Sequence, residues 1–157
     1  MTSDWPDVEL DQVRRMRVLA ASLPGVSYAE AHLDIPFDRV WAFIEDMETS
    51  MPALITDFRS FRIAERAPVG DAGEIRMKAK AVGLLGNRGA FDVILKPGWC
   101  LMQSRLVIGG MAASPEEGGT RFAGCGTLRL PGSRLLARAE GGRGAERIIA
   151  KLRTQLG

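Results

Sequence analysis

The sequence is poor in the residues that most often carry catalysis or bind metals. It contains one histidine, His32, and two cysteines, Cys100 and Cys125, among 157 residues. These three are too few for a zinc site of nitrogen and sulfur ligands, and a hydrolase triad would depend on His32 alone. Two cysteines also cannot form the disulfide framework of a small secreted domain. We therefore expect no metal ion and no cofactor.

Long apolar segments are absent as well. No uncharged apolar run approaches the roughly 18 residues that a membrane span needs, and the first residues are acidic and lack the apolar core of a signal peptide. We expect a cytoplasmic protein. With 157 residues, 46% hydrophobic and 25% charged, the chain has the size and balance of one globular domain. It can bury a core without disulfides or metals.

Positive charge is concentrated near the C-terminus. Residues 131–157 contain six basic and two acidic side chains, whereas the whole chain carries a net charge of only +2. A basic segment can bind nucleic acid or an anionic membrane, but cations near a helix end also complement the helix dipole. No aromatic residues alternate with these arginines, as they do in surfaces that stack bases. We expect no nucleic-acid partner, and membrane contact is a less favoured alternative.

The periodicity of apolar residues changes several times in the first third of the chain. Residues 7–23 show helical spacing, and Pro24-Gly25 ends that helix. From Ser27 the period becomes two, which predicts a strand with one buried face and places His32 on the other face. Pro36 and Asp38 then begin a helix, and a second short helix is predicted over residues 50–54.

The remaining chain alternates between strand patterns and turn residues. Strands are predicted over 58–65, 74–82, 90–96, 99–108, 111–114 and 120–130, with a bulge at Gly109-Gly110. Gly86–Gly89 is interpreted as a hairpin turn rather than a phosphate loop, because a strand follows it and not a helix. A helix over 132–156, interrupted near its glycines at 141, 142 and 144, completes the chain. The fold class is therefore α+β: a curved antiparallel sheet of six to seven strands around a long C-terminal helix, with two short helices after the first strand.

The segment Tyr28-Ala-Glu-Ala-His-Leu-Asp-Ile-Pro-Phe-Asp-Arg-Val-Trp-Ala-Phe-Ile-Glu-Asp46 resembles the opening of START-like domains of the SRPBCC superfamily. The resemblance covers about residues 26–156, and the segment 97–106 is similar to actinobacterial members related to polyketide cyclases. It implies the helix-grip fold, with an apolar ligand held in a cavity between the sheet and the long helix. Some relatives catalyse cyclisation or dehydration there. The superfamily shares no catalytic motif, so the catalytic residues stay unknown. Residues 1–25 are expected to form a helical extension and 26–157 the ligand-binding domain.

Strand parity predicts which side chains face such a ligand. Methionines and phenylalanines would form adaptable apolar walls, Ser104 would orient a polar group of the ligand, and the glycines at 124 and 126 would leave volume empty. The expected ligand-binding residues are Met51, Phe58, Met77, Phe91, Met102, Ser104, Phe122, Gly124 and Gly126. Cys100 should face inward as a core residue, and Cys125 should face outward.

Three functions are compatible with this pattern. The favoured one is binding of an apolar small molecule, such as a lipid, an isoprenoid or a polyketide, without catalysis. The first alternative is a cyclase or dehydratase acting on the same class of molecule, which should project acid–base groups into the site. The second is a lipid carrier whose basic final helix docks on anionic membranes. The side chains of Glu45, Asp46 and Glu48 point in different directions around their helix, so they cannot converge on one site, and we expect them to be exposed to solvent.

Overall fold

The computed structural model describes residues 11–69, 73–128 and 143–157. In chain order the elements are α1 (Gln12–Ser22), β1 (Ser27–Leu33), α2 (Phe37–Glu45), α3 (Met47–Leu54), β2 (Phe58–Val69), β3 (Glu74–Gly83), β4 (Arg88–Lys96), β5 (Trp99–Gln103), β6 (Val107–Glu116), β7 (Gly119–Leu128) and α5 (Arg143–Leu156). None of the helices in these ranges combines the length and the apolar character needed to cross a bilayer.

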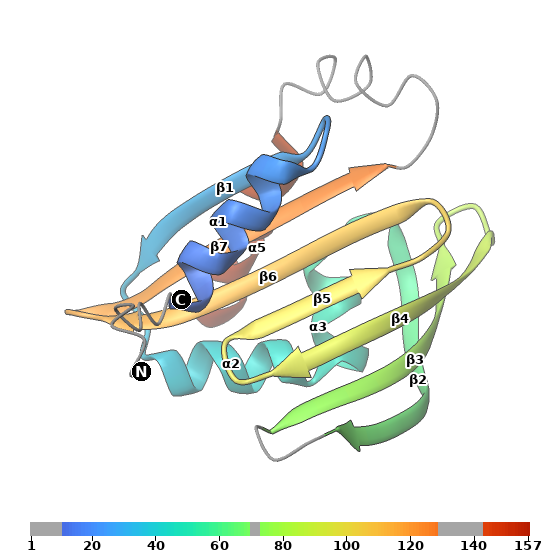
Figure 1. Ribbon diagram of the computed structural model, residues 1–157, viewed down its shortest axis with the longest axis horizontal. Coiled ribbons are helices and arrows are strands. Elements are labelled where there is room, and N and C mark those ends of the chain that lie inside the picture. The colour runs from blue at the N-terminus through green and yellow to red at the C-terminus, as the bar shows by residue number, and fades with distance from the viewer. Residues whose placement is uncertain (1–10, 70–72, 129–142) are drawn as a thin grey trace, which may run out of the picture.

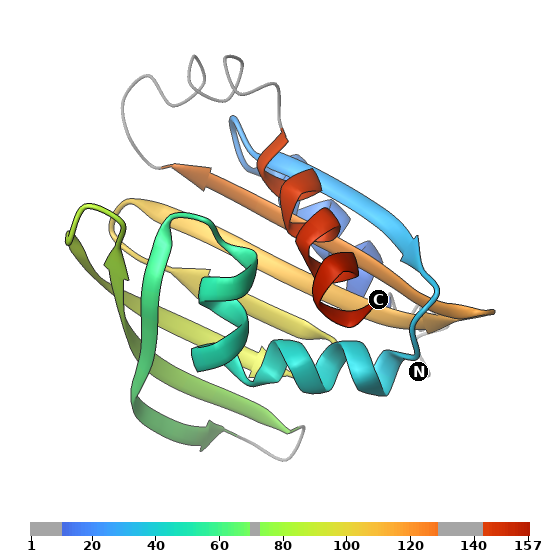
Figure 2. The ribbon, with the colours of Figure 1, turned by 180° about the vertical axis from the view of Figure 1, so that it is seen from behind.

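All seven strands form one antiparallel sheet, in the order β1-β7-β6-β5-β4-β3-β2. Helix α1 lies on one side of the sheet, the outer face (Figure 1). Seen from behind, α5 runs across β1 and β7, and α2 and α3 lie on the same side of the sheet, with α3 against β2 (Figure 2). We call this side the inner face. The predicted α+β architecture, with its antiparallel sheet and C-terminal helix, is confirmed.

The junction between β1 and α2 follows the sequence pattern closely. Pro36 stands at the N-cap, and the first turn carries Asp38 at the positive end of the helix dipole. The apolar stripe of α2 is buried through Val40, Trp41 and Ile44. The buried Thr120 hydroxyl donates to the Ile35 carbonyl at 2.7 Å, which fastens β7 to the residues between β1 and α2.

Helix α3 begins three residues before the predicted start at Ser50. It follows α2 directly. The buried Ser50 hydroxyl donates to the Ile44 carbonyl at 3.0 Å, so Ser50, which the sequence placed at the start of this helix, instead connects α3 to the end of α2. The acidic residues Glu45, Asp46 and Glu48 are exposed, as predicted. Glu48 also accepts a hydrogen bond from the Ile63 amide at 3.0 Å, which connects α3 to β2.

The predicted strand over 99–108 is wrong, because the chain reverses within it. Strand β5 ends at Gln103, and β6 runs unbroken from Val107 to Glu116 without a bulge at its two glycines. The cause is Ser104, whose hydroxyl oxygen accepts from the amides of Leu106 at 3.2 Å and Val107 at 3.0 Å. Such local bonds from serine compete with strand pairing and favour a turn. As a result Leu106 is 51% exposed rather than buried.

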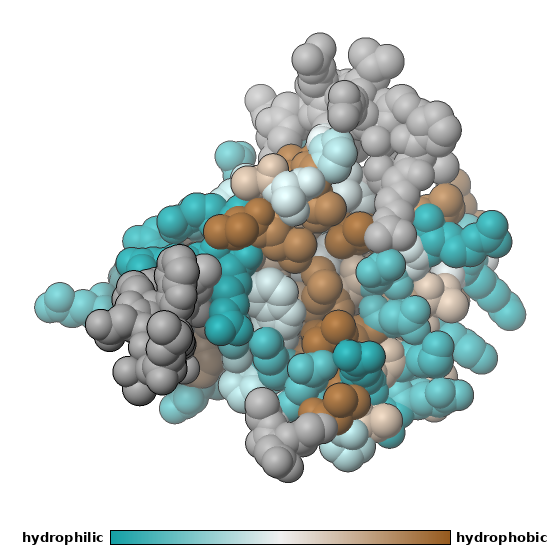
Figure 3. All heavy atoms as spheres, in the orientation of Figure 1, coloured by the Kyte–Doolittle hydropathy of each residue, from teal (hydrophilic) through white to brown (hydrophobic). Residues whose placement is uncertain are grey.

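Helix α1 packs onto the outer face through a small second core. Its buried residues Val13, Met16 and Ala20 meet Ala112, Ala123 and Cys125 of the sheet. Helix and sheet approach closely at Gly110, where a Cβ atom would lie 2.8 Å from Met16 Cε. Figure 3 shows an apolar band down the middle of this face, where the strand register places the half-buried side chains of Ile94, Leu101 and Ile108. Residues 7–10 of the predicted first helix lie outside the described residues.

Helix α5 is anchored at its beginning and buried along one side. The Ser27 hydroxyl oxygen accepts from the Ala145 amide at 3.1 Å, which joins the first turn of α5 to the start of β1. Ile149, Leu152 and Leu156 are buried in the main core, as the helical spacing predicts. The predicted stretch 132–142, with its expected interruption at Gly141 and Gly142, lies outside the described residues.

Candidate functional site

The inner face of the sheet is lined by very small residues where α5 crosses it. Gly126 of β7 lies opposite Ser27 of β1 and opposite Gly109 of β6. Two residues further along, Gly124 lies opposite Ala29 and Met111. Side chains on one face of a sheet alternate along each strand, so apart from Met111 this part of the inner face carries little side-chain volume. We call the three glycines of this region, Gly109, Gly124 and Gly126, the glycine floor. The sequence predicted a bulge at Gly109 instead.

The three floor glycines have free space around them. A Cβ atom added at Gly126 would meet only the Ile108 carbonyl oxygen, at 3.8 Å. At Gly124 its nearest neighbour would be Phe122 Cε1 at 3.7 Å, and at Gly109 the Cys125 carbonyl oxygen at 3.7 Å. These are ordinary van der Waals distances, so each position could accept a methyl group without moving a neighbour. Close packing therefore does not require glycine at these positions.

Three phenylalanines form one aromatic wall of the inner face. The Phe58 ring centroid lies 5.8 Å from that of Phe61 and 5.5 Å from that of Phe91, and Phe61 and Phe91 are 6.1 Å apart. The sequence predicted Phe58 and Phe91 but missed Phe61, which has the opposite strand parity. A register shift between Phe58 and Ser60 brings both β2 rings to the same side. Such a bulge depends on the pairing with β3 and has no clear local signal.

The predicted methionines lie in the same apolar cluster. Met51 of α3 is fully buried, Met77 and Met102 of the sheet are 3% exposed, and Phe122 is fully buried. Met111, next to Gly124, belongs to the cluster as well. The structure thus brings together eight of the nine expected residues, Met51, Phe58, Met77, Phe91, Met102, Phe122, Gly124 and Gly126, on or against the inner face.

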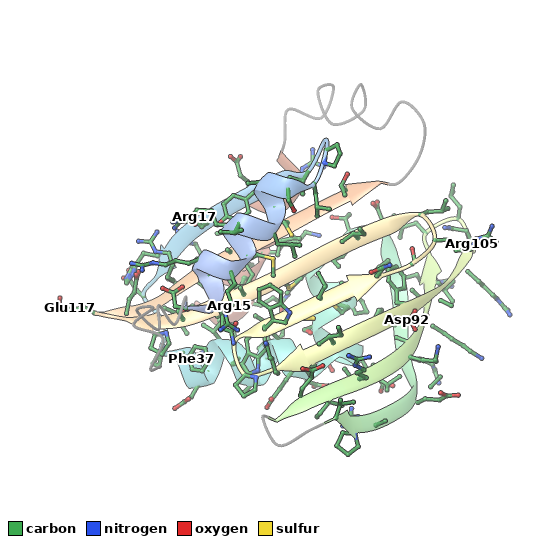
Figure 4. All side chains as sticks on the ribbon, viewed as in Figure 1. Arg15, Arg17, Phe37, Asp92, Arg105 and Glu117 are labelled. Atoms are coloured by element: carbon green, nitrogen blue, oxygen red, sulfur yellow. The ribbon has the colours of Figure 1, made fainter. Side chains whose placement is uncertain are left out.

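Ser104 is the ninth expected residue, and it lies elsewhere. It is part of the β5–β6 turn, where its hydroxyl is engaged by the turn amides. It borders a hollow of about 410 Å³ together with polar side chains that include Lys78, Asp92, Gln103 and Arg105. Figure 4 labels Asp92 and Arg105 on the side of the sheet that carries α1. The placement of Ser104 on an inner strand was wrong because the turn falls within the predicted strand.

Half-buried apolar residues gather at one end of the inner face, which we call the hairpin end because the β3–β4 and β5–β6 turns lie there (Figures 1 and 2). Ile55 follows α3, Phe58 begins β2, Val107 begins β6 and Ile148 lies on α5, and all four pack against the main core. Nearby, Lys151 of α5 donates to the Thr56 hydroxyl at 2.7 Å. The main core is therefore partly exposed at this end.

The inner face offers little acid–base chemistry. Among the described residues, the buried polar side chains are Ser50 and Thr120, and both donate to backbone carbonyls. Burial raises the pKa of the Cys100 thiol to about 12 and that of Cys125 to about 11. Both cysteines are therefore protonated at neutral pH and poor nucleophiles. The part of the chain described here also holds no group of three or more histidine, cysteine or acidic residues placed to bind a metal ion.

Cys100 and Cys125 lie on opposite faces, as predicted, but Cys125 is not exposed. Helix α1 covers it, and its thiol donates to the Met16 sulfur at a distance of 3.4 Å. Both cysteines are free and buried. The sequence could not predict this burial, because strand parity gives the face of a residue but not which helix covers that face.

His32 lies on the outer face, in an ionic cluster at the far end of the sheet from the hairpin turns. Its Nδ1 is hydrogen-bonded to Glu116, and its Nε2 lies 3.1 Å from Asp34 Oδ1. The bond to Glu116, with a smaller contribution from Asp34, raises the pKa of His32 above its usual value. The same bond, with help from Arg121, lowers the pKa of Glu116. The sequence placed His32 on the correct face but could not identify Glu116, which is 84 positions away along the chain.

A second ionic group connects α1 to β1. Arg17 makes two bonds to the Glu30 carboxylate, at 2.7 and 3.0 Å, and the Tyr28 hydroxyl donates to the same carboxylate. Partial burial, together with the bond to Glu30, raises the pKa of Tyr28 to about 12. Figure 4 labels Arg17 on α1, on the outer side. These contacts hold the helix on the sheet and lie on the opposite side from the glycine floor.

Comparison with known proteins identifies the fold. No family model and no curated protein matches the chain. Protein CC1736 from Caulobacter crescentus superposes with a TM-score of 0.65 at 15% identity, covering 83% of this chain and 95% of that one. Protein TTHA0849 from Thermus thermophilus gives 0.58 at 20% identity, covering 83% and 96%. The fold is the helix-grip fold.

A third match belongs to a protein of known pathway. The di-domain ARO/CYC BexL from the BE-7585A biosynthetic pathway superposes with a TM-score of 0.54 at 14% identity, covering 91% of this chain and 54% of that one. The helix-grip fold is thus shared with this ARO/CYC protein. At these identities the likeness concerns the fold, and function has to be argued from the residues of the site.

Proposed function

We propose that this protein binds an apolar small molecule between the inner face of its sheet and helix α5, without catalysing a reaction. The observation that carries the proposal is the glycine floor, Gly109, Gly124 and Gly126, where each position has room for a methyl group beside the main apolar core. Gly124 is buried, and Gly109 and Gly126 are half-buried. Protein interiors are normally filled to the density of organic crystals. Space kept beside adaptable methionine side chains suits a flexible apolar ligand such as a lipid, an isoprenoid or a polyketide.

Titration with a fluorescent apolar probe tests this proposal. Gly126→Leu places a side chain on the floor and is expected to weaken probe binding at least ten-fold, while Ala90→Leu adds the same side chain at an exposed position of β4 and should leave binding within two-fold. The unfolding free energy of Gly126→Leu should change by less than about 1 kcal/mol, since overpacking a filled core costs about 1–3 kcal/mol. No probe uptake by the wild type, together with strong destabilisation by Gly126→Leu, would contradict the proposal.

The cyclase or dehydratase alternative rests on the structural likeness to BexL. Such a reaction needs side chains that donate or accept protons beside the substrate. The buried groups available among the described residues are two thiols with raised pKa and two hydroxyls already bonded to the backbone. We therefore favour binding over catalysis. Turnover of an aromatic polyketide precursor by the purified protein would reverse that preference.

The basic final helix gives weak support to the carrier alternative. Lys151 is bonded to Thr56, and Arg153 donates to the His32 carbonyl at 3.1 Å, so two of its cations fasten α5 to the rest of the protein. Arg134 and Arg138 lie outside the described residues. We propose a cytosolic location on the composition of the chain, with any membrane contact made through a surface other than α5.

A further inference from the structure

Three leucines stand exposed on two neighbouring turns at the hairpin end. Leu84 and Leu85 of the β3–β4 turn are 60% and 97% exposed, and Leu106 of the β5–β6 turn is 51% exposed. The two turns are adjacent in both ribbon views (Figures 1 and 2). Exposed apolar side chains grouped at one end of a molecule are typical of a surface that contacts a partner or a membrane.

The β3–β4 turn holds its leucines in fixed positions. The Gly83 amide donates to the Asn87 carbonyl at 2.7 Å, and the Gly86 amide donates to the Gly83 carbonyl at 3.0 Å. The Leu84 amide donates to the Asp57 carbonyl at 3.2 Å, which ties the turn to the loop before β2. The leucines therefore project from a braced turn.

Cations surround these leucines. Lys80, Arg88 and Arg105 are exposed, and none of them forms an ion pair with another described residue. Arg105 is labelled at this end of the molecule in Figure 4. The acidic residue beside Leu84 is Asp57. The three leucines with Arg88 and Arg105 form what we call the tip surface, and the charge around it is mainly positive.

We propose that the tip surface docks on an anionic lipid bilayer. Leucine side chains can enter the boundary between headgroups and acyl chains, while arginines beside them bind lipid phosphates. Each cation near an anionic membrane strengthens the binding. Charge complementarity favours a bilayer over a second copy of this chain, whose tip surface would carry the same charge. Three leucines on two turns also present too little area for a stable dimer.

The tip surface lies next to the hairpin end of the inner face. Val107 follows Leu106 directly, and Phe58 pairs with Gly83, the residue before Leu84. Both Phe58 and Val107 belong to the half-buried apolar residues at the hairpin end. Docking would therefore bring the bilayer next to the half-buried apolar residues at the hairpin end. The docking itself does not depend on the proposed ligand binding, and the two are measured separately.

Sedimentation with vesicles tests the docking. The vesicles consist of phosphatidylcholine alone or of phosphatidylcholine and phosphatidylglycerol in a ratio of roughly 2:1, at low and high salt. The wild type is expected to bind the mixed vesicles and to lose binding at high salt. Replacement of Leu84, Leu85 and Leu106 by serine should weaken binding by about ten-fold or more. Val18→Ser, which removes an apolar side chain that is 62% exposed on α1, should change it less than two-fold.

A second pair of variants tests the cations. Arg88→Ser combined with Arg105→Ser should weaken binding and reduce its salt dependence, whereas Arg15→Ser on α1 should do neither. A wild type that does not bind the mixed vesicles would overturn the inference, and so would a leucine variant that binds as the wild type does. Dimerisation that depends on the leucines, without vesicle binding, would replace the bilayer by a second copy. Probe titration without vesicles reports ligand binding on its own, so either proposal can fail alone.

Discussion

Gly109 of β6 and Gly126 of β7 lie directly opposite each other on the inner face of the sheet. Neither has a positive φ angle, and a Cβ atom at either position would meet no atom closer than 3.7 Å. Glycine weakens a strand because it has no side chain to pack and loses much conformational freedom on folding. Two facing glycines that the backbone does not require are therefore best explained by the space they leave above the sheet.

Replacing Gly126 by alanine should leave the protein as stable as before or stabilise it by up to about 1 kcal/mol, because the substitution restricts the unfolded chain without straining the fold. Gly119→Ala provides the contrast. Gly119 has a φ of 155°, and its Cβ atom would lie 2.0 Å from the Leu33 carbonyl oxygen, so this variant should lose about 2 kcal/mol or more. Urea unfolding of both variants checks the prediction, and a clear loss of stability in Gly126→Ala would show that the floor is close-packed.

Met16→Ala should detach α1 from the outer face. Met16 is fully buried, between Gly110 and Cys125, and truncation of such a side chain usually costs about 2–5 kcal/mol. Val18→Ala, on the exposed side of the same helix, should cost no more than about 0.5 kcal/mol. Equal stability of the two variants would mean that α1 adds nothing to the fold, as expected for a separate extension of residues 1–25.

His32 and Glu116 should make stability depend on pH. The raised pKa of His32 means that its contribution is complete below its usual value of 6.5 and is lost as the pH rises through the raised value. The lowered pKa of Glu116 means that its contribution is present above its usual value of 4.5 and is lost as the pH falls through the lowered value.

The difference in unfolding free energy between the wild type and His32→Gln should therefore be largest between about pH 5 and pH 6.5 and should shrink as the pH rises further. The charged groups around the imidazole are Asp34, Glu116 and Arg121. Glu116→Gln should remove most of the pH dependence. A difference that is constant over this range would show that the two side chains are not coupled.

Both thiols should resist modification in the folded protein. Cys100 and Cys125 are buried, with pKa values raised to about 12 and about 11, and only the thiolate reacts readily with a disulfide reagent. Labelling with an aromatic disulfide at about pH 8 should be slow in buffer and rapid in denaturant. Fast reaction of one thiol in buffer, identified with the Cys100→Ser and Cys125→Ser variants, would contradict its burial.

Local sequence patterns predicted those parts of the fold that depend on residues close together in the chain. Alternation in β3 correctly placed Met77, Ala79 and Ala81 in the core, and the proline and acidic residue at the start of α2 marked that helix. The β5–β6 turn was missed because a single serine hydroxyl overrides an apolar strand pattern. Phe61 was missed because its orientation depends on a bulge against β3.

The floor of the site was predictable in part. Gly124 and Gly126 were expected from the parity of β7, whereas Gly109 became part of the floor only through the pairing of β6 with β7. Contacts between distant positions, such as His32 with Glu116 and Met16 with Cys125, have no signal within a single sequence. The described part of the site thus combines residues that a periodic pattern reveals with others that only the register brings together.

The central claim is that an apolar ligand occupies the space above the glycine floor, and methionine methyl resonances test it most directly. Met102 and Met111 lie on the inner face next to Gly109 and Gly124, whereas Met16 lies under α1 on the other side of the sheet. With ¹³C-methyl-labelled methionine, saturation with an apolar probe should shift the signals of Met102 and Met111 and leave that of Met16 unchanged. A shift confined to Met16, or no shift at saturating probe, would contradict the account.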